Sequence, residues 1–206
     1  VTDIAGCLAT SQAFVTAQLP APAEPYVFND GGIYICLGDA VTFTAETRPN
    51  ISNFWYSAAN GGFMIAFGDV LEVRPTNTGT VNYYVEAYDI NNPICRSLRV
   101  PVTVDVSNPS FGGHLSPVTQ TICQGDPVNV ITLSNEYGSV VRWEESTDGF
   151  VNVSPIQNGS NSFAPQFLSS STQYRAVVQN QGCAEAYSEP AAVNLIPQGS
   201  CGASIY

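Results

Sequence analysis

The sequence contains no lysine, and all six of its basic residues are arginines. Against these stand 17 acidic residues, so the formal net charge is −11. Nucleic acids and anionic membrane surfaces bind proteins through positive charge, which this composition does not supply, so we expect neither as a partner. The absence of lysine also excludes Schiff-base catalysis and Lys–Asn isopeptide cross-links.

Histidine and long apolar runs are equally scarce. The single histidine, His114, argues against a Ser-His-Asp or Cys-His catalytic site. Glu144 and Glu145 are neighbours on a predicted strand and should point to opposite faces, which does not suit a glycosidase carboxylate pair. No apolar run approaches the length of a membrane span. We therefore predict that the protein is not an enzyme and does not insert into a membrane.

Six cysteines in an acidic chain rich in Ser, Thr, Asn and Gly are typical of an oxidising, extracellular compartment. The chain begins with Val1 and shows no signal peptide, which favours a processed or excised part of a longer protein. Neither a Cys-x-x-Cys motif nor clustered histidines occur, so we do not expect a zinc site.

A short phrase, Cys-x-Gly-Asp followed by a Val-rich stretch, occurs at Cys36 and again at Cys123, 123 − 36 = 87 residues later. The only two tryptophans, Trp55 and Trp143, keep nearly the same spacing, 143 − 55 = 88. A fixed period of this size predicts one folding unit used in series. A further pair of cysteines, Cys95 and Cys183, follows the same period (183 − 95 = 88).

Within each unit, apolar residues alternate with polar ones, most clearly over residues 98–106 and 81–87. This period of two is typical of half-buried strands, and no stretch of helical length shows a period of 3.6. Short strands separated by turn signals predict an all-β fold of tandem β-sandwiches, each with about seven strands.

The period also suggests a division of the chain. We expect a first domain over residues 35–106, a linker over 107–121, a second domain over 122–197 and a C-terminal tail over 198–206. The segment 1–34 is predicted to hold a strand and a Pro-rich linker.

Cys7 precedes Cys95 by 95 − 7 = 88 residues, so residues 4–19 read as the last strand of a preceding copy. The same segment could instead complete the sheet of a neighbouring molecule by strand addition, with Ala13, Phe14 and Val15 as its apolar centre. A disordered leader is the plain alternative.

The repeat favours two disulfides, Cys36–Cys95 and Cys123–Cys183, because each pair then lies within one unit. Cys7 and Cys201 are left over. They could pair with each other, or Cys7 could have lost its partner with the missing part of a preceding copy.

Four aromatic residues form the candidate ligand surface. Tyr84 and Tyr88 share a strand face with Glu86, and Phe54 and Tyr56 point away from Trp55. If these residues meet on one sheet, they form an aromatic patch suited to sugar stacking or protein contact. The alternative is that they pack against a neighbouring unit.

Calcium is the only cofactor for which the sequence offers ligands. Residues 30–32, 89–92 and 148–149 place carboxylates in predicted loops. None has the spacing of an EF-hand, and solvated turns explain them more simply. We therefore expect no cofactor.

These landmarks resemble a known family. The Cys-x-Gly-Asp phrase, the Trp strand, a Pro before a Ser/Thr-rich turn, a Thr-x-Tyr strand and a late Cys are similar to the Ig-like repeats of large Bacteroidota surface proteins, such as gliding-motility adhesins and other cargo of the type IX secretion system. In this chain they are Cys36, Gly38, Asp39, Trp55, Pro75, Tyr83, Cys95, Cys123, Gly125, Asp126, Trp143, Pro165, Tyr174 and Cys183.

The resemblance implies an Ig-like fold and a non-enzymatic adhesin or stalk segment at the cell surface. It does not specify a ligand, and the aromatic patch is what favours a protein or a polysaccharide. Two alternatives stay open. One is a filament or pilus-like subunit that binds copies of itself through its N-terminal strand. The other is a carbohydrate-binding module of a larger secreted enzyme.

Overall fold

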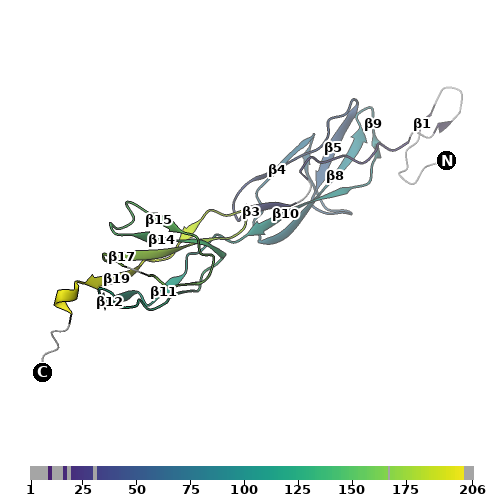
Figure 1. Ribbon diagram of the computed structural model, residues 1–206. Helices are drawn as coiled ribbons and strands as arrows, with labels where there is room; N and C mark the ends of the chain where they lie inside the picture. Colours follow the sequence, from purple (N-terminus) through teal and green to yellow (C-terminus); the bar gives the residue numbers. More distant parts are fainter. Residues whose placement is uncertain (1–8, 11–15, 18–19, 30–31, 167, 202–206) are drawn as a thin grey trace. The chain divides into compact units, whose positions relative to one another are not determined.

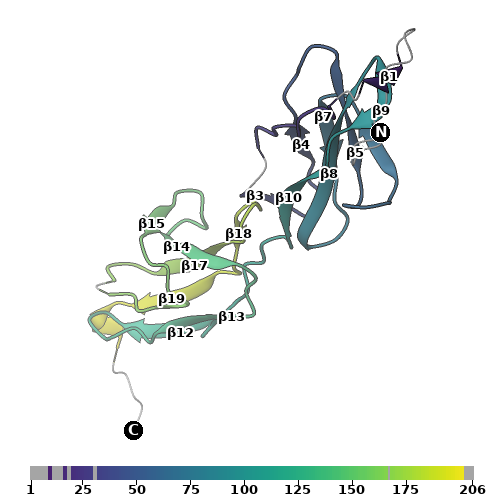
Figure 2. The same ribbon diagram turned by 90° about the vertical axis from the view of Figure 1, so that its right-hand side faces the viewer.

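A computed structural model of the chain describes residues 9–10, 16–17, 20–29, 32–166 and 168–201 (Figures 1 and 2). The chain divides into two compact units, Val1–Ser107 and Asn108–Tyr206. In the described residues both units are built from strands, and the only helical element is a short 3-10 turn, η1 (Gln198–Ser200). The predicted all-β class is therefore confirmed. Within the same residues, no helix is long and apolar enough to cross a membrane.

The first unit is a sandwich of two sheets. The large sheet has the order β3-β10-β8-β5-β6, with β9 attached to β8, and the small sheet pairs β4 with β7. The strands are β3 (Ile33–Cys36), β4 (Val41–Thr44), β5 (Ile51–Tyr56), β6 (Met64–Phe67), β7 (Val70–Val73), β8 (Gly79–Asp89), β9 (Asn92–Arg96) and β10 (Val100–Ser107).

The second unit repeats this arrangement. Its large sheet has the order β12-β19-β17-β14-β15, with β18 attached to β17, and its small sheet has the order β11-β13-β16. The strands are β11 (His114–Ser116), β12 (Thr119–Cys123), β13 (Ile131–Ser134), β14 (Ser139–Ser146), β15 (Ser154–Ile156), β16 (Ser162–Phe163), β17 (Thr172–Gln179), β18 (Ala186–Tyr187) and β19 (Ala191–Ile196).

The sequence repeat is thus a topological repeat: every strand of the first unit has a counterpart in the second, and only β11 is additional, with the Val27–Ala45 bridge in its place in the first unit. In each unit the strand that ends at the Cys-x-Gly-Asp cysteine runs parallel to the last long strand, which places Cys36 opposite Ser107 and Cys123 opposite Ile196. All other strand pairs of the two large sheets are antiparallel.

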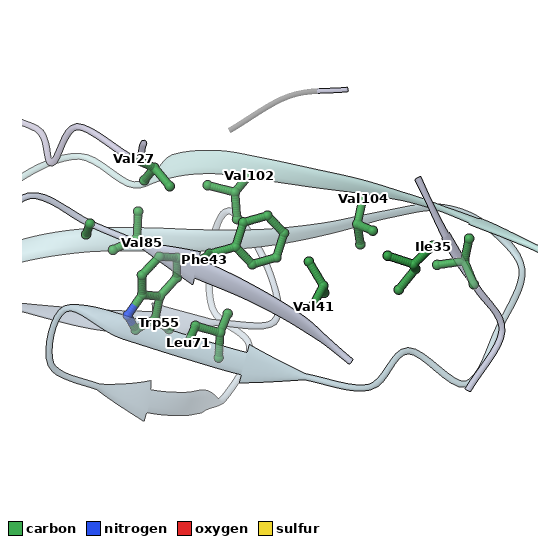
Figure 3. Packing of buried hydrophobic residues seen from close by; sticks show 11 residues of the cluster. Val27, Ile35, Val41, Phe43, Trp55, Leu71, Val85, Val102 and Val104 are labelled. Carbon is green, nitrogen blue, oxygen red and sulfur yellow. The ribbon is translucent and has the colours of Figure 1, made fainter. Parts of the chain in front are cut away.

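Trp55 is the centre of the first core (Figure 3). It is fully buried, its ring lies 6.4 Å from that of Phe43, and its Nε1–H donates to the carbonyl of Gly68 at 2.9 Å. Every second residue of β10 faces the same core, so Val102 and Val104 are buried while their neighbours are not. The alternation seen in the sequence is the pleat of a sheet with one packed face.

Trp143 has the same position in the second core. It is fully buried, packs 5.6 Å from the ring of Phe163, and donates its Nε1–H to the carbonyl of Ser160 at 2.9 Å. In both units the accepting carbonyl lies in the connection that follows the edge strand, β6 or β15. A tryptophan that fills the core and satisfies its N–H in this way fixes that connection to the sheet.

Two predicted linkers belong to the sandwiches instead. Val27, placed in the linker over 1–34, is 2% exposed, belongs to the first core and forms a β-bridge with Ala45. The predicted linker 107–121 contains β11 and part of β12, and its Leu115 is buried in the second core. These segments are too short, and too close to prolines and glycines, to show an alternation that sequence reading can detect.

Within residues 4–19, the described part is a pair of two-residue strands, β1 (Ala9–Thr10) and β2 (Thr16–Ala17), which are antiparallel to each other. The predicted strand-addition residues Ala13, Phe14 and Val15 lie outside the described residues, as does Cys7.

Candidate interaction surface

The four aromatic residues predicted as a ligand surface lie on one face of the first large sheet. The register of β5 and β8 places Tyr56 opposite Tyr84, and Phe54 and Tyr88 at neighbouring positions of the same face. Trp55 and Val85 point the other way and are fully buried. The four residues therefore occupy the outer face of the sheet.

Their rings pack against one another rather than projecting separately. Phe54 and Tyr88 are stacked, with centroids 4.0 Å apart and an interplanar angle of 12°. Phe54 also meets Tyr56 edge to face at 6.4 Å. Tyr56 is 7% exposed, so most of its ring is covered.

A buried carboxylate, Glu86, organises the centre of this face. It is 6% exposed and accepts a hydrogen bond from the Tyr56 hydroxyl at 2.9 Å. Arg96 and Arg99 bind its two oxygens at 2.8 and 3.2 Å. Burial, together with the hydrogen bond and charge of Glu86, raises the pKa of Tyr56 above its usual value.

The two guanidinium groups also cover the aromatic rings. Arg99 lies 3.4 Å from the centroid of Tyr56, and Arg96 lies 4.9 Å from that of Phe54. Arg99 further donates to the carbonyls of Ala58 and Gly61, both at 2.7 Å, which ties down the β5–β6 connection. Sugar stacking needs an open ring face, and on this sheet stacking partners and arginines occupy much of that area.

The sequence did not single out Arg96 and Arg99. Their positions depend on β9 folding back beside β8, where Arg96 is opposite Tyr88. A hairpin return of this kind has no periodic signature, and the only hint was two arginines spaced by three residues in an arginine-poor chain.

The outer face continues to an exposed edge that sequence reading also missed. Phe67 is opposite Phe54, and Met64 is opposite Tyr56. We call Phe63, Met64 and Phe67 the β6 rim; their exposed fractions are 69%, 51% and 73%. The sequence feature that could have indicated this exposed edge is the run of residues 54–68, which contains no charged side chain.

The second unit carries a different cluster on the equivalent face. Glu144 is 4% exposed and lies between Arg142 and Arg175, at 2.9 and 2.7 Å. Arg142 also binds Glu185 through two hydrogen bonds of 2.6 and 2.8 Å. This guanidinium holds the pKa of the Glu185 carboxyl below its usual value.

Aromatic rings again enclose a guanidinium in this cluster. Arg175 lies 4.3 Å from the ring centroid of Phe150 and 4.0 Å from that of Tyr187. Four of the six arginines of the chain are thus used in the two outer-face clusters, each bound to a buried glutamate. Such networks stabilise the face on which they lie.

The loops considered for calcium form internal turns. Both oxygens of Asp148 accept hydrogen bonds, from the backbone and side chain of Asn152 and from the Ser146 hydroxyl. These bonds lower the pKa of Asp148 to about 2. Asp89 accepts from the backbone N–H of Asn91. Asp30 and Gly31 lie outside the described residues. In the part of the chain that the structure describes, no three His, Cys, Asp or Glu side chains are grouped as metal ligands would be.

Two grooves lie in the second unit. One, of about 400 Å³, runs beside the second Cys-x-Gly-Asp turn and is lined mainly by apolar groups, including Pro127, Val128 and Leu168. The other, of about 320 Å³, is lined mainly by hydroxyl and amide side chains, including those of Thr147 and Asn152. Neither contains a residue predicted as a ligand contact.

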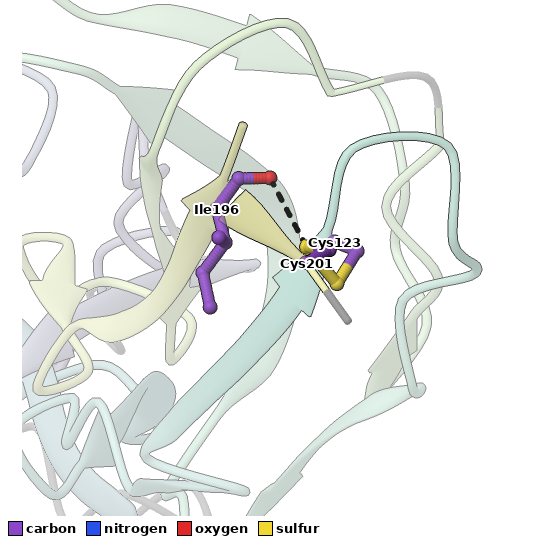
Figure 4. Close-up of a disulfide and its surroundings, with 3 residues drawn as sticks. All are labelled: Cys123, Ile196 and Cys201. Carbon is purple, nitrogen blue, oxygen red and sulfur yellow. Dashed lines mark hydrogen bonds between the residues drawn. A yellow bond between two sulfur atoms is a disulfide. The ribbon is translucent and has the colours of Figure 1, made fainter. Parts of the chain in front are cut away.

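A disulfide in the second unit joins Cys123 to Cys201, with Cα atoms 5.9 Å apart (Figure 4). The predicted Cys123–Cys183 bridge is therefore wrong, and so is a pairing of Cys7 with Cys201. Cys123 is the last residue of β12 and lies opposite Ile196. Because Cys201 comes five residues after Ile196, both cysteines lie at the same end of the sheet. Cys201, which the sequence placed in a C-terminal tail, is thus fastened to the sandwich.

Strand register explains the failure of Cys123–Cys183. Thr172, at the start of β17, pairs with Val193 near the Cys123 end of the sheet. Cys183 follows the other end of β17, where its carbonyl accepts from Gln179 at 3.0 Å. Seven residues of strand separate Thr172 from Gln179, or about 23 Å at about 3.3 Å per residue, which is far beyond disulfide reach.

The same geometry excludes Cys36–Cys95. Cys36 is opposite Ser107, next to the pair formed by Val106 and Gly79 at the start of β8. Cys95 lies on β9, which pairs with the far end of β8 around Tyr88. The distance along β8 is 88 − 79 = 9 residues, or about 30 Å. Cys36 and Cys183 each form a disulfide bond. The strand registers therefore exclude only Cys95 as the partner of Cys36 and Cys123 as the partner of Cys183.

Comparison with known protein families gives one match for each unit. A family described as "Ig-like domain CHU_C associated" matches residues 22–109. A domain family of unknown function, DUF8696, matches residues 112–197. No curated protein matches the chain.

Solved structures are similar in fold. Domains A168–A170 of titin match with a TM-score of 0.51 and 18% identity, covering 89% of this chain and 72% of that one. The fibronectin(III)-like modules of Clostridium thermocellum CbhA match with a TM-score of 0.45 and 14% identity, covering 88% and 100%. The strand topology described above, the titin match and the match of residues 22–109 to an Ig-like family define the fold class: tandem Ig-like β-sandwiches.

Proposed function

We propose that this chain is a non-enzymatic segment of an extracellular or cell-surface protein, where it serves as part of an adhesin or stalk of the type found in large Bacteroidota surface proteins. The observation that carries the proposal is the repetition of one complete sandwich, each copy with its own core around a buried tryptophan. Units used in series present a surface at a distance from their anchor, which is the work of a stalk.

The disulfide supports an extracellular setting. The Cys123–Cys201 bond persists where the surroundings are oxidising, outside the reducing cytosol. The acidic, lysine-free composition favours solubility over contact with nucleic acid or anionic lipid.

The arrangement of polar groups supports a non-enzymatic role, as is general for Ig-like domains. His114 is exposed on β11, and its ring contacts Phe111 at 5.8 Å. Glu144, the most buried carboxylate of the second unit, is neutralised by two arginines. The buried charges of the described residues are therefore committed to structural pairs rather than to proton transfer.

A binding assay tests the adhesive role. Beads coated with the 206-residue chain are applied to surfaces carrying host proteins or bacterial polysaccharides, and retention under flow is measured. Retention should fall for Tyr88→Ala, which opens the stacked pair with Phe54, and stay unchanged for Val151→Ala, an exposed residue of the second unit. A chain that retains beads on no surface would leave only the stalk role.

A second candidate is a polysaccharide-binding module, and the observation that favours it is that Tyr84 and Tyr88 remain partly exposed on the outer sheet face. Affinity electrophoresis in gels containing soluble polysaccharides tests it. Retardation that Tyr84→Ala and Tyr88→Ala both abolish would favour the module over the stalk.

For the filament alternative, the strand-addition residues lie outside the described residues. Its test is polymer formation that is lost when residues 1–20 are removed.

A further inference from the structure

One of the two edge strands of the first large sheet, β6, lacks the usual protection. β6 is the last strand of the described sheet, so one of its sides has no strand beside it. Natural proteins commonly blunt such edges with proline or charged side chains. β6 reads Met-Ile-Ala-Phe, and residues 54–68 around it contain no charge, although the chain as a whole has a net charge of −11.

Hydrogen bonds on either side of β6 show which of its backbone groups point outward. The N–H of Gly68 donates to Asn53 at 2.8 Å, and the N–H of Ser57 donates to Phe63 at 3.2 Å. The backbone groups of Gly68 and Phe63 therefore face β5. Along an antiparallel ladder, residues whose backbone N–H and C=O groups face the partner strand alternate with residues whose groups point outward. The N–H and C=O groups of Phe67 and Met64 therefore point away from β5.

The spacing of these outward groups is irregular. Outward residues of a regular strand are two apart, but the register of β5 and β6 skips Ile65 between Met64 and Ala66. This bulge places the outward residues 67 − 64 = 3 positions apart. A regular strand cannot match both of them in register, whereas a second β6 carries the same irregular spacing.

We propose that β6 of two copies of this chain pair antiparallel about a two-fold axis. Met64 of each copy then faces Phe67 of the other, so both sets of outward groups are satisfied. The β6 rim, whose phenylalanine and methionine side chains are of the kind enriched in interface cores, packs across the axis. The uncharged run 54–68 lets two acidic chains approach here without repulsion between like charges.

The second unit supports this assignment by contrast. Its edge strand β15 carries Pro155 opposite Glu144, the position that Met64 occupies opposite Tyr56. A proline there has no N–H to offer a neighbouring strand. Of the two equivalent edge strands β6 and β15, one is therefore open and the other is closed, and a symmetric contact between two β6 strands ends at a dimer rather than a fibre.

Sedimentation velocity of the 206-residue chain over a wide concentration range tests the proposal. The mass should rise with concentration from 21.9 kDa toward twice that value, in oxidising and reducing buffer alike. Met64→Pro, which copies the second unit, should weaken dimerisation at least about tenfold. Its fold is checked by the fluorescence of Trp55 in a Trp143→Phe background.

Phe67→Ser tests the rim without changing the backbone, and Leu98→Ser is its matched control, because the two side chains are 73% and 75% exposed in the same unit. The first substitution should lower dimerisation and the second should not. A monomer at all concentrations, or a dimer that survives both Met64→Pro and Phe67→Ser, would overturn the proposal. Neither result bears on the adhesin or stalk role.

Discussion

The two units share every strand pairing of their large sheets, yet the outer faces of these sheets differ in chemistry. The first unit places three aromatic rings, and the second three charged side chains, at equivalent positions: Phe54, Tyr56 and Tyr84 against Arg142, Glu144 and Arg175. The inner faces hardly differ, because each must fill a core around a tryptophan. Core packing constrains one face of a sheet and leaves the other free to change.

Both outer faces nevertheless contain a buried glutamate between two arginines. In the first unit the acid is Glu86 on β8, and in the second it is Glu144 on β14. The acid has changed strand while the pairing has been kept. This indicates that neutralising a half-covered sheet face matters more than which strand supplies the charge.

The largest expected effect tests whether the two cores are equivalent. Trp55→Ala and Trp143→Ala should each cost about 3–5 kcal/mol, because each removes a fully buried indole and a hydrogen bond of 2.9 Å to a loop carbonyl. Denaturant unfolding followed by circular dichroism measures the cost. Costs that differ by more than the width of this range would show that one tryptophan supports its unit less than the other.

Removal of the disulfide should affect the second unit. Cys123→Ser combined with Cys201→Ser opens a loop of 78 residues and should destabilise that unit by about 2–4 kcal/mol. Trp143 fluorescence reports the unfolding midpoint of that unit in a Trp55→Phe background. Peptide mapping of non-reduced protein is the control, and a bridge from Cys123 to any residue other than Cys201 would contradict the structure.

The glutamate clusters should differ in their tolerance of charge removal. Glu86→Gln leaves Arg96 and Arg99 without an acid and should cost about 2–4 kcal/mol. Glu144→Gln should cost less, because Arg142 keeps its bonds to Glu185. Glu72→Gln, at an exposed position of β7, is the control and should stay within about 0.5 kcal/mol of the parent. Equal costs for the two buried glutamates would remove the distinction between the clusters.

The smallest expected effect appears at alkaline pH. Burial, with the charge of Glu145, raises the pKa of Tyr174 from 10.0 to about 12. The folded state therefore keeps the Tyr174 proton to a higher pH than the unfolded state does. The resulting contribution to the free energy of unfolding is complete below pH 10.0 and is lost as the pH rises to about 12. The Tyr174→Phe variant should show a flatter fall in stability over that range. Tyr83, the equivalent residue in the first unit, is only partly buried, and its substitution by Phe should change the profile less. Titration of tyrosinate absorbance checks both.

Residue pattern alone was enough to predict much of the fold. The spacing of Cys36, Trp55 and their later counterparts revealed the repeat, and the alternation along 98–106 assigned the buried face of β10. Alternation also placed Phe54 and Tyr88 on the face opposite Trp55, where the structure stacks them. These properties depend on residues close together in the chain, whose side chains point to known sides of a strand.

Partners at a distance were decided by the tertiary structure. The bond between Cys123 and Cys201, the arginines around Glu86 and the open edge at β6 all depend on which ends of which strands meet. A sequence period records which residues are equivalent between units but not which of them are neighbours in space. Strand order and register bring Cys201 to Cys123 and keep Cys183 at the far end of the sheet, because a disulfide reaches only a few ångströms and a strand extends about 3.3 Å with every residue.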